Sequence, residues 1–215
     1  MYDEAREICS IVLEQFLKNK ELLALKKRCY SRHSLHSRGN RFRQKDSERL
    51  VQLHQSGNVH EVYREASDWL RKAEDNPTLF DLAGSAASAI GEYETATVFF
   101  SRSVEKDPLV AQNYCNLGLA LIHIDEADRA IESFQKAVKI DPKNSEYHSN
   151  LAAALLNRGN LDASEFSYLA ALDLEPANSD ALQNLAKIKN RKNDQEGVAA
   201  CYKKLLASSP DSRDA

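Results

Sequence analysis

The chain is poor in the residues that bend or cross-link a polypeptide. Its 215 residues include only 7 Gly, 5 Pro and 4 Cys. So little Gly and Pro disfavours an all-β protein, because most connections between strands need a tight turn. The cysteines are widely scattered, at Cys9, Cys29, Cys115 and Cys201. Such scatter favours reduced thiols in a cytosol-like compartment over a disulfide framework.

Long apolar runs are also lacking. No run of the sequence approaches the roughly 18 apolar residues that a transmembrane helix requires, so none is expected. The first ten residues carry Asp3, Glu4 and Glu7, which does not fit a signal peptide. We therefore expect a cytoplasmic location.

Charge is distributed unevenly along the chain. Residues 26–45 contain eight Lys and Arg and no acid, whereas residues 46–215 contain 18 Lys and Arg against 27 Asp and Glu, a net charge of −9. The two parts are therefore electrostatically distinct. A basic segment of this kind is typical of a solvated linker, and binding to nucleic acid or an anionic membrane is the less favoured interpretation.

What the sequence does contain is a period of 34 residues. The phrase FQKAVKIDPKN at 134–144 returns as YLAALDLEPAN at 168–178, with residue types in the same order. Similar residues recur at this spacing in several columns, namely Pro108, Pro142, Pro176 and Pro210; Phe100, Phe134, Tyr168 and Tyr202; Gly84, Gly118, Ala152 and Ala186; Ala96, Ala130, Ser164 and Val198. Agreement across independent columns indicates an internal repeat.

Each repeat predicts a short helical hairpin. The stretches AQNYCNLGLALIH and ADRAIESFQKAVKI both place apolar residues at helical spacing. Between them stands Asp125, where neighbouring units have Gly91 and Gly159, which indicates a left-handed backbone that ends the first helix. Pro142 is expected to stop the second helix, and Asn144 or Ser145 to cap the next.

The small residues predict how the hairpin packs. Gly118 and Ala130, one on each helix, let the two backbones approach closely, and Phe134 fills the space beside them. A single hairpin cannot bury its own apolar face, so the next hairpin must cover it.

The pattern Leu117-Gly118, Ala130, Phe134, Ala137 and Pro142 resembles the tetratricopeptide repeat. The resemblance implies an all-α fold, a right-handed α-solenoid of helix-turn-helix units. We place the units at about 43–76, 77–110, 111–144, 145–178 and 179–212. Unit 43–76 is degenerate, with Arg49-Leu50 in the Leu-Gly columns, and its Trp69 is expected to plug one end of the core.

These boundaries divide the chain into three parts. Residues 46–212 form the predicted repeat domain, residues 26–45 a basic linker, and residues 1–25 an amino-terminal helix that caps the stack or docks a partner. At the other end, the sequence offers no following hairpin to cover Val198, Tyr202, Leu205 and Leu206. Two hypotheses follow: this end self-associates, or the chain is part of a larger protein.

The resemblance also implies a binding surface, because the first helix of each such repeat lines a concave groove. The matching peptide-binding candidates are Gln112, Asn116, Leu119, His123, Glu146, Asn150, Asn157, Gln183, Asn184, Lys187 and Arg191. A carboxylate clamp, which co-chaperones of this family build from Lys and Arg, is excluded because Asp81, Ser85, Glu146 and Asn150 occupy the matching places.

Three of the candidates, Asn116, Asn150 and Asn184, form a ladder with the 34-residue spacing. An amide both donates and accepts hydrogen bonds, so such a ladder can pair with a peptide backbone. In this it looks like the asparagine ladder of O-linked N-acetylglucosamine transferase. The other interpretation is that each Asn bonds locally within the fold, and the sequence does not decide between them.

Sites for chemistry are not indicated. Cys29, His33 and His36 lack a fourth ligand and the spacing of a metal site. Cys115 is interpreted as a small buried residue rather than a nucleophile. We find no phosphate-binding loop or catalytic motif, so neither a cofactor nor a small-molecule substrate is predicted.

The sequence thus predicts a non-catalytic protein–protein interaction scaffold that binds a peptide or partner protein in its groove. Two alternatives remain. The chain is a repeat arm or regulatory subunit of a larger enzyme, of glycosyltransferase or sulfotransferase type, or it is a tether that holds nucleic acid or membrane through residues 26–45.

Overall fold

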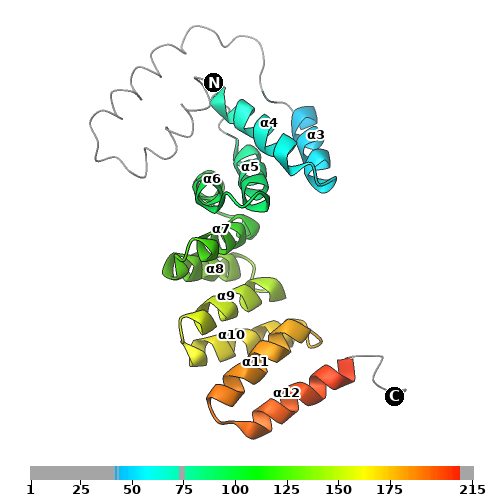
Figure 1. Ribbon diagram of the computed structural model, residues 1–215, viewed down its shortest axis with the longest axis vertical. Helices are drawn as coiled ribbons and strands as arrows, with labels where there is room; N and C mark the ends of the chain where they lie inside the picture. The colour runs from blue at the N-terminus through cyan, green and yellow to red at the C-terminus, as the bar shows by residue number, and fades with distance from the viewer. Residues whose placement is uncertain (1–41, 43, 73–75, 209–215) are drawn as a thin grey trace, which may run out of the picture. The chain divides into compact units, whose positions relative to one another are not determined.

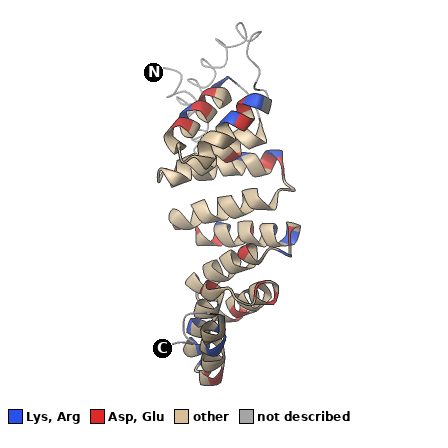
Figure 2. Ribbon diagram, turned by 90° about the vertical axis from the view of Figure 1, so that its right-hand side faces the viewer, with Lys and Arg blue, Asp and Glu red and all other residues tan. Residues whose placement is uncertain are grey.

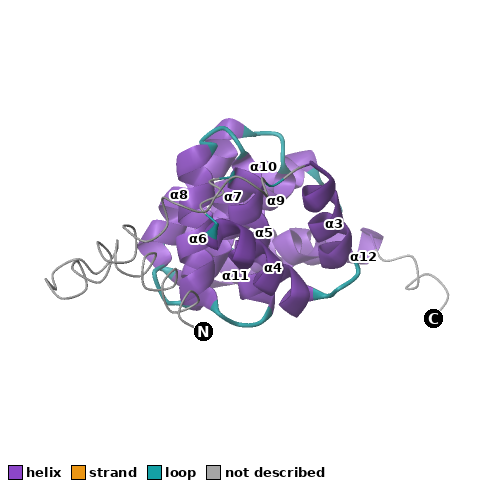
Figure 3. Ribbon diagram, turned by 90° about the horizontal axis from the view of Figure 1, so that it is seen from above, coloured by secondary structure: helices purple, strands orange, loops and turns teal. Residues whose placement is uncertain are grey.

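The computed structural model describes residues 42, 44–72 and 76–208, which fall into two compact units divided between Pro108 and Leu109. The predicted helix at 1–25 and nearly all of the basic segment 26–45 lie outside the described residues. Within the described part of the chain, the secondary structure is helical with connecting loops and no strand (Figure 3). No helix in that part is long and apolar enough to span a bilayer.

The first unit contains two helical hairpins (Figure 1). Helices α3 (Gln44–Gln55) and α4 (Val59–Arg71) form the first, and α5 (Pro77–Ala89) and α6 (Tyr93–Lys106) form the second. Helix α4 also packs against α5, so the degenerate first repeat does fold as a hairpin and joins the stack. Its Trp69 is half-buried and packs edge-on against Phe42, with ring centroids 5.4 Å apart.

The second unit contains three hairpins. They are formed by α7 (Ala111–His123) with α8 (Ala127–Ile140), α9 (Ser145–Asn157) with α10 (Leu161–Leu174), and α11 (Ser179–Arg191) with α12 (Gln195–Ser208). Each helix packs against the next, and α9 also contacts both α7 and α11. Hairpins that stack on their neighbours in this way define an all-α helical repeat solenoid, as the 34-residue period predicts.

The turns within the hairpins confirm the left-handed column. Gly91 and Gly159 have φ of 85° and 78°, and Asp125 and Asn193 adopt the same conformation with φ of 61° and 59°. At each of these places the chain reverses after the first helix of its hairpin. The two non-glycine residues are of the types that tolerate a left-handed backbone best.

The caps decide one point that the sequence left open. The Asn144 side chain accepts hydrogen bonds from the backbone N–H groups of Glu146 and Tyr147, so Asn144 caps α9. Ser145 instead donates its hydroxyl to Glu175 at 2.9 Å, which ties the start of α9 to the end of α10. Asn178 caps α11 in the same manner as Asn144.

A close approach between the helices of a hairpin is confirmed at two glycines. A Cβ atom added to Gly118 would lie 2.6 Å from the Phe134 ring, and one added to Gly84 would lie 2.7 Å from the Phe100 ring. Both rings are buried. The Gly and Phe columns therefore form a single packing unit, repeated in both parts of the structure.

Candidate functional site

The eleven predicted groove residues all lie on the first helices of the three hairpins in the second unit. Helix α7 carries Gln112, Asn116, Leu119 and His123; α9 carries Glu146, Asn150 and Asn157; α11 carries Gln183, Asn184, Lys187 and Arg191. None of the eleven is buried. Because α9 contacts both α7 and α11, these side chains belong to adjacent helices of one unit. We call these eleven side chains the first-helix face.

The asparagine ladder makes hydrogen bonds within the protein. Asn116 accepts from Gln112 at 2.9 Å, Asn150 donates to the Cys115 sulfur at 3.3 Å, and Asn184 accepts from Lys187 at 3.0 Å. Each amide is half-buried and keeps part of its surface in solvent. Local bonding therefore occurs at every step of the ladder, and a peptide would have to share these amides with it.

Tyr147 is a buried residue of α9 that contacts this surface through its hydroxyl, and the sequence analysis did not identify it. Its hydroxyl donates to Gln112 at 3.0 Å, and Gln112 in turn donates to Asn116. A hydrogen-bonded chain thus crosses from α9 to α7. Tyr147 stands 35 residues after Gln112, one more than the repeat period, so a search along the 34-residue columns does not pair them.

Cys115 is a buried packing residue, as predicted. It is fully buried on α7, and that burial raises the pKa of its thiol to about 11, against a smaller opposing effect of the Asn150 amide. A thiol with so high a pKa is protonated at neutral pH and is a poor nucleophile. Burial likewise raises the pKa of Tyr168 to about 12, and Asn184 offsets part of the rise.

The charges on the first helices are separated along the helix axes. Glu146 and Asp180 occupy the first turns of α9 and α11, whereas Lys187 and Arg191 lie toward the end of α11. All four are exposed. This polarity agrees with the helix dipole, which favours acids at the first turn and cations at the last.

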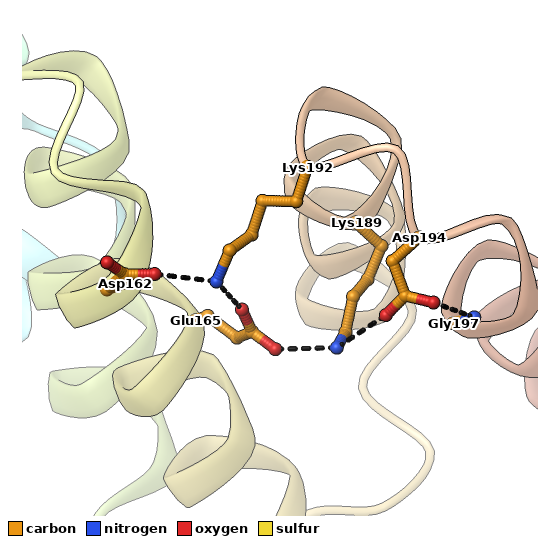
Figure 4. A network of polar contacts seen from close by, with 6 residues as sticks. All are labelled: Asp162, Glu165, Lys189, Lys192, Asp194 and Gly197. Atoms are coloured by element: carbon orange, nitrogen blue, oxygen red, sulfur yellow. Dashed lines mark hydrogen bonds and ion pairs between the residues drawn. The ribbon is translucent and has the colours of Figure 1, made fainter.

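A second group of charges lies where the last two hairpins meet, as Figure 4 shows. Glu165 on α10 receives Lys189 and Lys192 from α11 and its C-cap, each at 2.6 Å. Lys192 also reaches Asp162 at 2.6 Å, and Lys189 reaches Asp194 at 2.9 Å. We call these five side chains the ionic cluster. It joins α10 to α11 and to the turn that precedes α12.

Hydrogen bonds donated by Lys189 and Lys192 lower the pKa of Glu165. The bonds that Lys189 donates to Glu165 and Asp194, and Lys192 to Asp162 and Glu165, raise the pKa of both lysines. The cluster is specific to this junction. In the unit before, the places of Glu165 and Lys189 are taken by Ile131 and Leu155. The sequence analysis did not identify the cluster, because Glu165 and Lys189 are 24 residues apart and belong to different columns.

One ionic contact does recur with the repeat. Arg158 pairs with Asp128 at 2.9 Å, and Lys192 pairs with Asp162 at 2.6 Å. In both pairs the acid lies in the first turn of a second helix, and the cation is the C-cap of the first helix that follows 30 residues later. Figure 2 shows positions of both signs mixed over the last helices rather than gathered by sign.

Among the residues that the structure describes, no group of three or more His, Cys, Asp and Glu could hold a metal ion. The candidate ligands Cys29, His33 and His36 lie outside those residues. Hydrogen-bonding amides, an imidazole, exposed charges and one exposed apolar side chain, Leu119, make up the chemistry of the first-helix face.

The fold and this face define a class, the helical-hairpin repeat proteins. Two family models match the sequence, a TPR repeat model at residues 126–159 and a tetratricopeptide repeat model at residues 145–178. With the repeat columns and the stacked hairpins, these matches identify the chain as a tetratricopeptide repeat protein. No curated protein matches the sequence significantly.

Solved structures share the fold at low sequence identity. The MamA protein is 21% identical with a TM-score of 0.69, over 74% of this chain and 87% of that one. MamA from Desulfovibrio magneticus RS-1, residues 41 to the end, is also 21% identical with a TM-score of 0.71, over 78% and 94%. YrrB, described as a TPR protein with an unusual peptide-binding site, is 19% identical with a TM-score of 0.67, over 76% and 84%.

Proposed function

We propose that this chain is a non-catalytic interaction scaffold that binds an extended peptide or a partner protein on its first-helix face. The observation that carries the proposal is that eleven polar, charged and apolar side chains lie side by side on α7, α9 and α11 without being used in the core. Peptide binding by YrrB, a protein of the same fold, supports it.

The recognition chemistry follows from the residue types. The half-buried amides of Asn116, Asn150 and Asn184 can each offer a donor or acceptor to a peptide backbone, in exchange for a local bond. Exposed acids lie in the first turns of α9 and α11, and cations lie toward the end of α11. These charges would favour ligand side chains of the opposite sign at each end. The amides would fix the position of the peptide backbone along the face, and the charges would select among peptide sequences.

The test must separate binding from folding. Alanine at the three ladder positions also removes hydrogen bonds inside the protein, so it is not the first choice. Asn157, Gln183 and Arg191 are better targets, because they are exposed and make no side-chain hydrogen bond or ion pair within the described residues. A triple variant Asn157→Ala, Gln183→Ala, Arg191→Ala should melt at the same temperature as the parent.

The matched control replaces exposed residues on the second helices, with the variant Glu132→Ala, Gln135→Ala, Lys139→Ala on α8. Both variants and the parent are compared against a displayed library of extended peptides, and selected peptides are then measured by titration calorimetry. The proposal expects peptides that bind parent and control equally and lose at least about tenfold affinity for the triple variant. Peptides that bind all three proteins alike would refute it.

A further inference from the structure

Side chains on and beside the first-helix face form rows that cross α7, α9 and α11. Residues four and seven places apart on an α-helix lie on the same side of it, because each residue turns by about 100°. The 34-residue period gives each of these places one residue on every first helix. Three successive rows are the acid row, Gln112, Glu146 and Asp180; the ladder, Asn116, Asn150 and Asn184; and the mixed row, Leu119, Ala153 and Lys187.

Two hydrogen bonds show how these rows line up between α7 and α9. The Tyr147 hydroxyl donates to Gln112 at 3.0 Å, and the Asn150 amide donates to Cys115 at 3.3 Å. Both bonds join residues 35 apart, one more than the repeat period. The two helices therefore run in the same direction and nearly in register, so the members of a row are neighbours. Helix α9 also contacts α11, its counterpart in the next hairpin.

The ladder is less exposed than the rows on either side of it. Its three amides are half-buried, whereas all three members of the acid row are exposed. In the mixed row Leu119 and Lys187 are exposed and Ala153 is half-buried. A peptide whose backbone bonds to the ladder therefore has the acid row along one edge and the mixed row along the other.

The two flanking rows differ in charge. The acid row carries Glu146 and Asp180, both in the first turn of their helix. Within the part of the chain that the structure describes, neither side chain makes a hydrogen bond or an ion pair. The mixed row is apolar at Leu119 and Ala153 and cationic at Lys187. The face is therefore electrostatically asymmetric across the ladder, and the asymmetry is strongest at α11.

An extended peptide divides its side chains between these two edges. Successive residues of an extended backbone point to opposite sides, and each residue advances the chain by about 3.3 Å. Packed helices lie roughly 8–10 Å apart, so a peptide needs about five or six residues to cross from α7 to α11. Every second residue of the peptide then faces the acid row, and the residues between them face the mixed row.

We propose that the first-helix face binds an extended peptide with the residue order aliphatic, cation, any residue, cation, acid, in either chain direction. The two cations lie on one edge and face Glu146 and Asp180. The aliphatic residue and the acid lie on the other edge, where they face Leu119 and Lys187 respectively. This inference rests on the proposed function, because it assumes that the peptide backbone lies along the ladder.

The test is selection from a displayed library of random peptides, made in parallel against the full chain and its charge variants. The parent should enrich the proposed order several-fold over the unselected library. The double variant Glu146→Lys, Asp180→Lys should select acids in place of the two cations and keep the aliphatic residue. Lys187→Glu should select a cation in place of the acid. Glu132→Lys, an exposed charge reversal on α8, is the matched control and should select the parent's order.

One selected peptide is then titrated by fluorescence anisotropy. Glu146→Lys should weaken its binding about threefold or more, and replacing the facing peptide cation by Glu should restore it. Circular dichroism checks the fold of each variant. Because a cation in the first turn opposes the helix dipole, Glu146→Gln and Asp180→Asn are the second pair of variants, and the enrichment of cations should disappear with them.

The outcomes separate this inference from the proposed function. Selected peptides that bind the first-helix face without this order would overturn the inference and leave the proposed function intact. The same holds for peptides whose order does not respond to the charge variants. If the library yields no peptide that binds this face, both are overturned.

Discussion

The Phe134 ring occupies the space that any side chain at Gly118 would need, since an added Cβ would lie 2.6 Å from its Cε1 atom. We expect Gly118→Leu to force apart α7 and α8 and to lower the free energy of unfolding by about 3 kcal/mol, through overpacking. Urea denaturation measures the loss. In the variant that also carries Phe134→Leu, the two effects should fall well short of additive, because the ring causes the clash. Full additivity would place the strain elsewhere.

Asp125 has a left-handed backbone conformation at a place where the neighbouring units have glycine, namely Gly91 and Gly159. Asp125→Gly should be close to neutral or stabilising by about 0.5 kcal/mol, because relief of the left-handed strain is offset by a more flexible unfolded chain. Asp125→Val should lose about 1 kcal/mol or more. Melting curves of the two variants side by side check the sign. A valine variant as stable as the glycine variant would contradict the prediction.

The ionic cluster should make the stability of the second unit sensitive to acid. Glu165 has a pKa lowered by Lys189 and Lys192, so the cluster stabilises the fold fully above the unfolded carboxyl pKa of about 4.3. That contribution is lost as the pH falls through the lower folded-state pKa of Glu165. At neutral pH Glu165→Gln should cost no more than about 1 kcal/mol, because part of the cluster is exposed to solvent.

The measurement is thermal unfolding of the parent and Glu165→Gln at several pH values from neutral to strongly acidic. The difference between the two melting temperatures should be constant at neutral and weakly acidic pH and should shrink below about pH 4. Glu132→Gln, a fully comparable change at an exposed position of α8, should show no such difference. A gap that stays constant into strong acid would mean that the charge of Glu165 is not what stabilises the junction.

Cys115 should resist alkylation in the folded protein. Its pKa of about 11 leaves far less thiolate at pH 8 than an unfolded cysteine has, so its reaction with iodoacetamide should be slower by on the order of a hundredfold. Peptide mass spectrometry in native buffer and in urea gives the two rates for this residue separately from the other cysteines. Equal rates would show that α7 opens easily or that the thiol is not buried.

The sequence predicted what depends on columns and missed what depends on side-chain reach. The bounds of α7 and α8, the left-handed turns and the contact between Gly118 and Phe134 all followed from residues that repeat every 34 places. The ionic cluster and the bond from Tyr147 to Gln112 did not, because they join residues 24, 27 and 35 apart. Which of these side chains meet depends on the packing angle between neighbouring hairpins. The repeat period alone does not specify that angle.

The sequence also could not choose between Asn144 and Ser145 as the cap of α9, because a contact with another helix distinguishes them. Both residue types can cap a helix, but the Ser145 hydroxyl donates to Glu175, the C-cap of the following helix α10, and Asn144 caps α9. For the first-helix face, the sequence predicted that the eleven residues lie on the first helices of their hairpins, and they do; that they bind a peptide stays a prediction. It did not predict that the ladder amides bond to Gln112, Cys115 and Lys187, because no motif in the sequence marks these residues as hydrogen-bond partners.

The ionic cluster also bears on how the protein comes apart. In a stack where each hairpin holds only its neighbours, fraying starts at a terminal hairpin and spreads inward. The α11–α12 hairpin is joined to α10 by three ion-pair contacts that salt screens, whereas the junction before it has Leu155 and Ile131 in the places of Lys189 and Glu165. Hydrogen exchange of α11 and α12 should therefore quicken with ionic strength while that of α7 and α8 hardly changes, so that ionic strength would govern detachment of the last hairpin.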